Sequence, residues 1–180
     1  MSMLACAGTG SQTADTGKTS ASTASPSATA PTRGGKLYVQ APAHYDKDSG
    51  VQPKVKEECA LDTKVSQRIQ ESAKAAFDVV SSKTLADAGS NKALSLTIVS
   101  VQGVGGGAWS GPKSITLQGS LKQGGKVIGT FTGRRTSGGG MWGGYKGTCA
   151  IFDRDAEALG KDVAEWLAAP SMNAKLGELK

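Results

Sequence analysis

Three consecutive segments between residues 93 and 135 alternate apolar and polar side chains, and this feature most limits the folds open to the chain. Residues 93–102 read ALSLTIVSVQ, residues 114–121 read SITLQGSL, and residues 126–135 read KVIGTFTGRR. Alternation with a period of two is typical of strands that bury one face only. Gly124 and Gly125 lie between the last two segments and can supply the positive φ of a tight turn. The pattern predicts an antiparallel β-meander.

Two segments with helical periodicity flank the meander. The first is expected to begin near Asp62, a good N-cap residue, and to end around residues 81–82. The second is expected from about residue 150 to residue 169, with Thr148 as its cap and Pro170 as its stop. The first apolar stripe comprises Leu61, Val65, Ile69, Ala73, Ala76, Phe77 and Val80, and the second comprises Ile151, Ala158, Leu159, Val163, Trp166 and Leu167.

A further strand is expected at residues 37–43, followed by a polar loop at residues 44–56. The resulting order of elements is β-α-β-β-β-α. It predicts an α+β domain of two layers, in which two helices cover one face of a mostly antiparallel sheet. We expect one globular domain over residues 37–180.

Residues 1–36 differ in composition from the rest of the chain. They contain 13 Ser or Thr and 7 Ala, with no aromatic residue and Leu4 as the one branched aliphatic residue. Such a segment buries too little apolar surface to offset its conformational entropy, so we expect a disordered tether. Its start, Leu4-Ala5-Cys6-Ala7, resembles the end of a lipoprotein signal peptide, which predicts lipidation of Cys6, for example by palmitate. Only five residues precede Cys6, and a start assigned too late or a trimmed terminus would account for the missing apolar run.

The two other cysteines each precede one predicted helix. Cys59 comes just before the first and Cys149 just before the second. If the two helices lie side by side and point the same way, their starts are neighbours and a disulfide can join them. The pair would then indicate an oxidising compartment. The alternatives are two buried free thiols in a cytosolic protein, or a metal site that adds His44 as a third ligand.

The sequence offers little material for catalysis. His44 is the only histidine, and no serine stands in the Gly-x-Ser-x-Gly context of a hydrolase. Residues 103–108 fit a dinucleotide-binding pattern, but the following Trp-Ser-Gly-Pro cannot start the helix that such a site needs. We therefore expect no enzymatic activity, no cofactor and no metal, with a small hydrolase that uses His44 as the remaining alternative.

One surface combines cations with aromatic residues in the glycine-rich loops. These residues suit contacts with phosphate or glycan; they could equally form a satellite of the core, with solvated arginines. The candidate ligand-binding residues are Trp109, Arg134, Arg135, Trp142, Tyr145 and Lys146. The net charge of +6 is spread along the chain, so we expect no nucleic-acid partner.

Four segments carry a resemblance to known proteins: Trp109-Ser110-Gly111-Pro112-Lys113-Ser114, Tyr145-Lys146-Gly147-Thr148-Cys149, residues 158–167, and Glu58-Cys59 before the first predicted helix. They resemble a family of uncharacterised proteobacterial envelope lipoproteins. The resemblance covers roughly residues 57–170. The order of elements is also similar to the amino-terminal domain of the Tol-Pal translocation protein and to the periplasmic domain of the curli-secretion lipoprotein.

The resemblance and the tether together imply a periplasmic domain that a lipid on Cys6 anchors to the outer membrane. We expect it to act without catalysis, as an adaptor or assembly component with an envelope protein partner. The alternative is a binding module for anionic envelope glycans or lipids.

Overall fold

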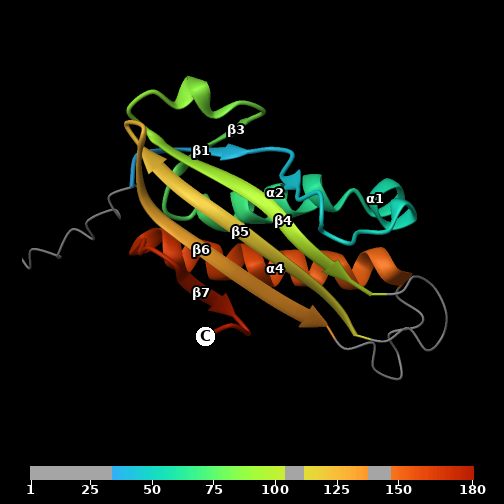
Figure 1. The fold of residues 1–180 in the computed structure, drawn as a ribbon. Coiled ribbons are helices and arrows are strands. Elements are labelled where there is room, and N and C mark those ends of the chain that lie inside the picture. Colours follow the sequence, from blue (N-terminus) through green and yellow to red (C-terminus); the bar gives the residue numbers. More distant parts are fainter. Residues whose placement is uncertain (1–33, 104–111, 138–146) are drawn as a thin grey trace, which may run out of the picture. The chain divides into compact units, whose positions relative to one another are not determined.

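The computed structural model describes residues 34–103, 112–137 and 147–180, and these form a mixed sheet covered on one face by helices. Strands β4 (Lys92–Gln102), β5 (Lys113–Gln123) and β6 (Lys126–Ser137) form an antiparallel meander. Gly124 and Gly125 have φ angles of +55° and +79° in the turn between β5 and β6. The α+β class and the meander are therefore confirmed (Figure 1).

Parallel strands extend the meander on both sides. Strand β1 (Lys36–Gln40) pairs with β4, and β3 (Asp78–Ser82) pairs with β1 at the edge of the sheet. Strand β7 (Ala174–Gly177) pairs with β6 at the opposite edge. The short β2 (His44–Tyr45) also pairs with β4. The order across the sheet is β3-β1-β4-β5-β6-β7, with β2 beside this path.

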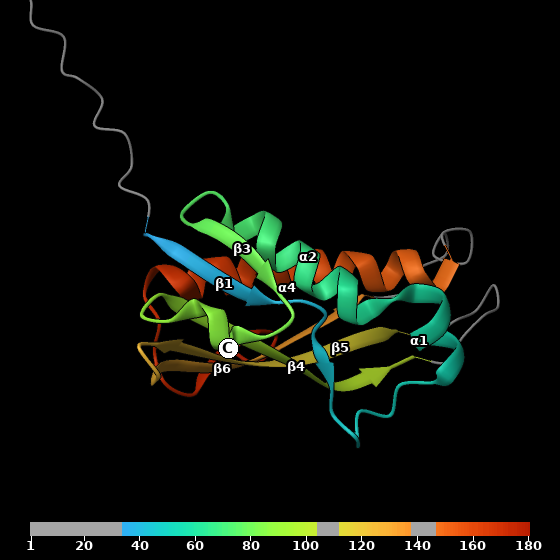
Figure 2. The ribbon, with the colours of Figure 1, turned by 90° about the horizontal axis from the view of Figure 1, so that it is seen from above.

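Two long helices, α2 (Leu61–Ala73) and α4 (Gly147–Ala168), form the second layer (Figure 2). The short α1 (Pro53–Cys59) leads into α2, and the 3-10 helix η1 (Leu85–Ala88) connects β3 to β4. The core lies between helices and sheet. Fully buried side chains from both layers fill it, among them Leu61, Ile69, Leu96, Ile98, Ile115, Leu117, Phe152, Leu159 and Val163.

Close approach of two helices depends on a glycine in α4. A Cβ atom on Gly160 would lie 2.6 Å from the carbonyl oxygen of Arg68 in α2. The Arg68 side chain crosses the same interface and donates two hydrogen bonds to Asp153, at 3.1 Å and 2.6 Å. Cys59, two residues before α2, is bonded to Cys149 in the first turn of α4, and Gly160 further along α4 lies against Arg68 and Ser72 further along α2, so the two helices run in the same direction. The expected parallel arrangement is present.

Three local predictions were wrong. The first long helix ends at Ala73, and Val80 lies in β3, because pairing with β1 outweighs the helical periodicity of the segment. Residues 44–56 were predicted as a loop but contain β2 and the start of α1. Thr148 lies in the first turn of α4, which begins at Gly147, so it is no cap residue.

Within the described residues, no helix combines the length and the apolar character needed to cross a bilayer.

Candidate functional site

The two arginines predicted as ligand-binding residues point to opposite faces of the sheet. Arg135 pairs in register with Ile115 on the face that the helices cover. Its guanidinium donates hydrogen bonds to both carboxylate oxygens of Asp162 in α4, at 2.7 Å and 2.6 Å. These bonds and the charge of Asp162 raise the pKa of Arg135. Arg135 therefore joins the two layers through its ion pair with Asp162.

Arg134 lies on the face that faces away from α2 and α4, which we call the open face. It pairs in register with Thr116 of β5 and with Gly177 of β7. Its Nε atom is buried and has no hydrogen-bond partner within the described residues. Among the described residues no carboxylate forms an ion pair with it. Of the two predicted arginines, Arg134 is therefore the one without an ion-pair partner in the part of the chain that the structure describes.

The other predicted ligand-binding residues, Trp109, Trp142, Tyr145 and Lys146, lie outside the described residues, as does Cys6. Their roles remain predictions.

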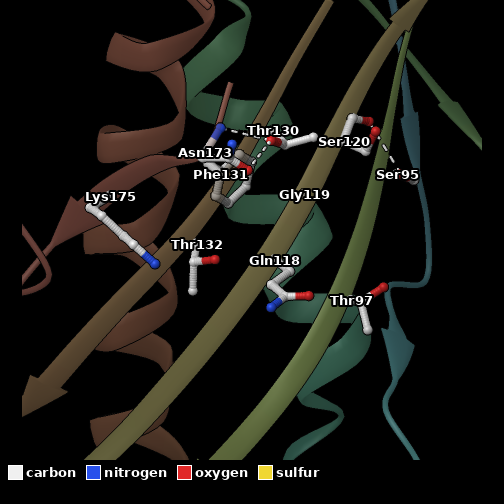
Figure 3. Close-up of a pocket in the computed structure, with 10 residues that line it drawn as sticks. All are labelled: Ser95, Thr97, Gln118, Gly119, Ser120, Thr130, Phe131, Thr132, Asn173 and Lys175. Carbon is white, nitrogen blue, oxygen red and sulfur yellow. Dashed lines mark hydrogen bonds between the residues drawn. The ribbon is translucent and has the colours of Figure 1, made fainter. Parts of the chain in front are cut away.

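The open face carries a groove of about 350 Å³ that the sequence analysis did not predict (Figure 3). It extends across β4, β5 and β6 and reaches β7 and Asn173, the residue that precedes β7. The lining is hydroxyl and amide side chains with one lysine: Ser95, Thr97, Gln118, Gly119, Ser120, Thr130, Phe131, Thr132, Asn173 and Lys175. The polar positions of the strand alternation mark this face, but strand order alone brings them together with β7.

Several groove side chains have no hydrogen bond of their own within the described residues. Ser95 donates to the carbonyl oxygen of Ser120, and Thr130 bonds Asn173. The side chains of Thr97, Gln118 and Thr132 make no such bond and point into the groove (Figure 3). They can donate and accept hydrogen bonds to a bound molecule.

A second hollow of about 350 Å³ shares Ser95 with this groove. It lies between η1 and the β5–β6 turn, and its lining is more apolar, with Leu85, Ala88 and Ala93.

The predicted pair Cys59 and Cys149 forms a disulfide with a Cα–Cα distance of 5.0 Å. Cys59 ends α1 and is 2% exposed, and Cys149 lies in the first turn of α4 against the core. The bond thus joins the two helical segments where α2 and α4 begin. The alternatives of free thiols and of a metal site that uses these thiols do not describe this structure.

A buried acid lies near the start of α4. Asp155 is 1% exposed and accepts a hydrogen bond from the Ser137 hydroxyl at the end of β6. Its Oδ2 atom is buried, and no residue of the described ranges makes a hydrogen bond with it. Burial raises the pKa of this carboxyl to about 6. On the same end of the sheet, burial lowers the pKa of Lys113, which pairs in register with Ser137.

His44 is exposed in β2. The two cysteines that were considered as metal ligands beside it are joined in the disulfide, so they have no free thiol to bind a metal. Within residues 34–103, 112–137 and 147–180, no group of three His, Cys, Asp or Glu residues is placed to hold a metal ion.

Comparison with known proteins gives structural likeness only. No family model and no curated protein matches the sequence. A protein from Xanthomonas campestris described under the family DUF330 aligns with 76% of this chain and 85% of its own, at 12% identity and a TM-score of 0.45. A protein from Helicobacter pylori described as a neuraminyllactose-binding hemagglutinin homologue aligns with 75% of this chain and 83% of its own, at 8% identity and a TM-score of 0.40.

A minor lipoprotein from Acinetobacter baumannii aligns with 74% of this chain and 90% of its own, at 11% identity and a TM-score of 0.38. At these scores the likenesses carry no argument about what this chain does.

Proposed function

We propose that this chain is an exported, non-enzymatic domain of the bacterial cell envelope that uses the open face of its sheet as a binding surface. In this proposal a lipid on Cys6 anchors the domain to the outer membrane, and residues 1–36 serve as the tether. The partner is an envelope protein, for which the domain acts as an adaptor or assembly component. The fold likeness to the Tol-Pal and curli-secretion domains stays a prediction.

The disulfide between Cys59 and Cys149 is the observation that carries the compartment. Disulfides persist in oxidising compartments such as the periplasm and are rare in the reducing cytosol. This bond joins residues 90 positions apart, with one sulfur in the core, so it is part of the folded structure. An exported protein accounts for such a bond directly.

The open face supports a binding role because nothing within the described residues covers its centre. The side chains that line its groove are mostly polar, and among the residues that the structure describes several of them have no hydrogen-bond partner. The second candidate function, a binding module for anionic glycans or lipids, is favoured by Arg134, whose charge is available on this face.

Alkylation of protein isolated from its native cells tests the compartment. The chain is denatured without reductant, treated with an alkylating reagent and analysed by mass spectrometry. We expect Cys59 and Cys149 to stay unmodified until a reductant is added. Free thiols at both positions would contradict export.

Metabolic labelling with a palmitate analogue tests the anchor. The full-length gene product should be labelled and should sediment with the outer membrane, and the Cys6→Ser variant should lose both properties. Equal labelling of the two proteins would remove Cys6 as the lipid site while leaving the disulfide result unaffected.

A further inference from the structure

We propose that the groove on the open face binds an acidic oligosaccharide. Lys175 in the groove and Arg134, two positions beyond the lining residue Thr132 on β6, hold its acidic groups, and the hydroxyl and amide side chains of the lining bind its sugar hydroxyls. This inference rests on the second candidate function above, a binding module for anionic glycans or lipids on the open face. It chooses the glycan over the lipid and adds the residues that contact it.

The first step is the state of Arg134. A buried hydrogen-bond donor without an acceptor is uncommon in folded proteins and calls for an explanation. The Nε atom of Arg134 is such a donor, and no carboxylate of the described residues pairs with this guanidinium. A planar guanidinium binds carboxylate and phosphate groups through two parallel hydrogen bonds. Arg134 as a whole is half-buried, so a ligand acid can pair with the exposed part of its guanidinium, although not with the buried Nε atom itself.

Lys175 provides a second cation on the same face. It pairs in register with Thr132, and the next position of that face on each strand is the pair Arg134 and Gly177. Lys175 is exposed and lines the groove. No ion pair engages it among the described residues.

Glu178, the acidic residue nearest to Lys175 in the sequence, forms no ion pair with Lys175 or Arg134. Both carboxylate oxygens of Glu178 accept hydrogen bonds at 2.7 Å from Thr136, one from its amide and one from its hydroxyl. None of the ten residues that line the groove is acidic. The groove therefore favours an anion.

The length of the groove favours a chain of sugars over a single ion. The lining comes from β4, β5, β6 and β7, which are neighbours in this order. Strands lie about 4.8 Å apart, so the groove spans about 14 Å. Thr97, Gln118 and Thr132 distribute unused hydrogen-bonding groups along this distance.

The lining also disfavours a lipid tail. Phe131 is the only large apolar residue among the described lining residues, and it is 2% exposed. An acyl chain would find little exposed apolar surface in this groove and would gain little from leaving water or membrane. The ligand that fits is polar along its whole length.

Isothermal titration of the folded, disulfide-bonded chain with tetragalacturonate tests the inference, and cellotetraose serves as the neutral tetramer. We expect tetragalacturonate to bind, cellotetraose to bind at least tenfold more weakly, and affinity to fall as salt rises. Arg134→Gln and Lys175→Gln should each weaken binding about tenfold, since charge-assisted hydrogen bonds are lost. Lys74→Gln removes an exposed cation from the helical layer and should leave affinity unchanged.

Thr132→Val gives a test that keeps all charges and nearly the same shape. It should weaken binding severalfold without changing the salt dependence, and thermal unfolding checks that each variant is folded.

Equal affinity for the two tetramers, unchanged binding by both cation variants, or no binding at millimolar sugar would overturn the inference. Binding to vesicles of phosphatidylglycerol in place of tetragalacturonate would overturn it as well, by showing a lipid surface as the ligand. None of these results bears on the disulfide or on Cys6, so the proposed compartment is tested separately.

Discussion

Arg135 of β6 donates two hydrogen bonds to Asp162 of α4, and this pair links the sheet to the helical layer. The Asp162 side chain is 7% exposed and the Arg135 side chain 36%. The bend at Gly177, with a φ of +65°, brings β7 against the same pair; a Cβ there would lie 3.1 Å from Asp162. The neighbouring Arg134 takes no part, because adjacent residues of a strand point to opposite faces.

Exchange of Arg135 for glutamine should therefore destabilise the fold, while the same exchange at Arg134 should not. Arg135→Gln leaves the Asp162 carboxylate buried without its cation, for which we expect a loss of about 1–3 kcal/mol in the free energy of unfolding. Arg134→Gln should change it by less than about 0.5 kcal/mol. Urea denaturation measures both free energies of unfolding. Equal losses would show that Arg134 stabilises the fold as much as Arg135 does.

Loss of the disulfide should destabilise the domain strongly. The bond between Cys59 and Cys149 closes a loop of 90 positions, and the chain-entropy model gives about 4–5 kcal/mol for a loop of this length, as an upper limit. We expect the Cys59→Ser, Cys149→Ser double variant to lose about 2–5 kcal/mol. Wild-type protein with a reductant should unfold at nearly the same urea concentration as the variant without it. A reductant that leaves the wild-type midpoint in place would contradict this.

A methyl group at Gly160 should separate the two long helices. Alanine favours a helix over glycine by about 1 kcal/mol, but here its Cβ would meet the carbonyl oxygen of Arg68, which belongs to rigid backbone. We expect Gly160→Ala to lower the free energy of unfolding by about 1–3 kcal/mol, because the clash exceeds the gain in helix propensity. Arg154→Ala, at an exposed position of the same helix, is the control and should be nearly neutral. A more stable Gly160→Ala variant would show that the helices can move apart freely.

Ionisation of Asp155 should make stability depend on pH between about 4 and 6. Burial raises the pKa of Asp155 to about 6 in the folded chain, whereas a free aspartate titrates near about 3.9. Between these values the folded chain binds a proton that the unfolded chain releases, so stability falls as pH rises through this window. Above it, the ionised carboxylate opposes folding by at most about 3 kcal/mol.

Asp155→Asn removes this titration. Urea denaturation at each pH measures the free energy of unfolding of both proteins. From pH 4 to pH 7 the wild type should lose about 1–3 kcal/mol of stability relative to the variant. A difference that stays constant with pH would show that Asp155 titrates normally.

Predictions that depend on local pattern agree best with the structure. The alternation in β4, β5 and β6 reflects a buried and an open face of one sheet, and the turn glycines have the positive φ that their position requires. The long C-terminal helix ends two residues before Pro170. Proline has no amide hydrogen to donate, and its ring would clash with the preceding turn of the helix. The edge strands were missed because β3 follows a helical stripe without a break and β7 is four residues long.

The candidate site shows the same division. The sequence indicates that cations at positions 134 and 135 could bind an anion, but alternation alone does not say which face the helices cover. The ion pair with Asp162 of α4 shows that Arg135 lies on the covered face. The pairing of β7 with β6 places Lys175 beside Thr132 and so adds a cation to the open face. The unused hydroxyls of the groove carry no motif, because their only shared property is a face of the sheet.

By itself, the sequence determined the meander, the two-layer class and the two cysteines that precede the long helices, since these follow from side-chain periodicity and short-range backbone preference. Only the tertiary structure decided that the helices run in parallel with Cys59 beside Cys149, that Arg135 and not Arg134 pairs with Asp162, and that a polar groove crosses four strands. These features depend on which distant segments pack together, and that is set by the burial of the whole core and by strand order, which no local pattern encodes.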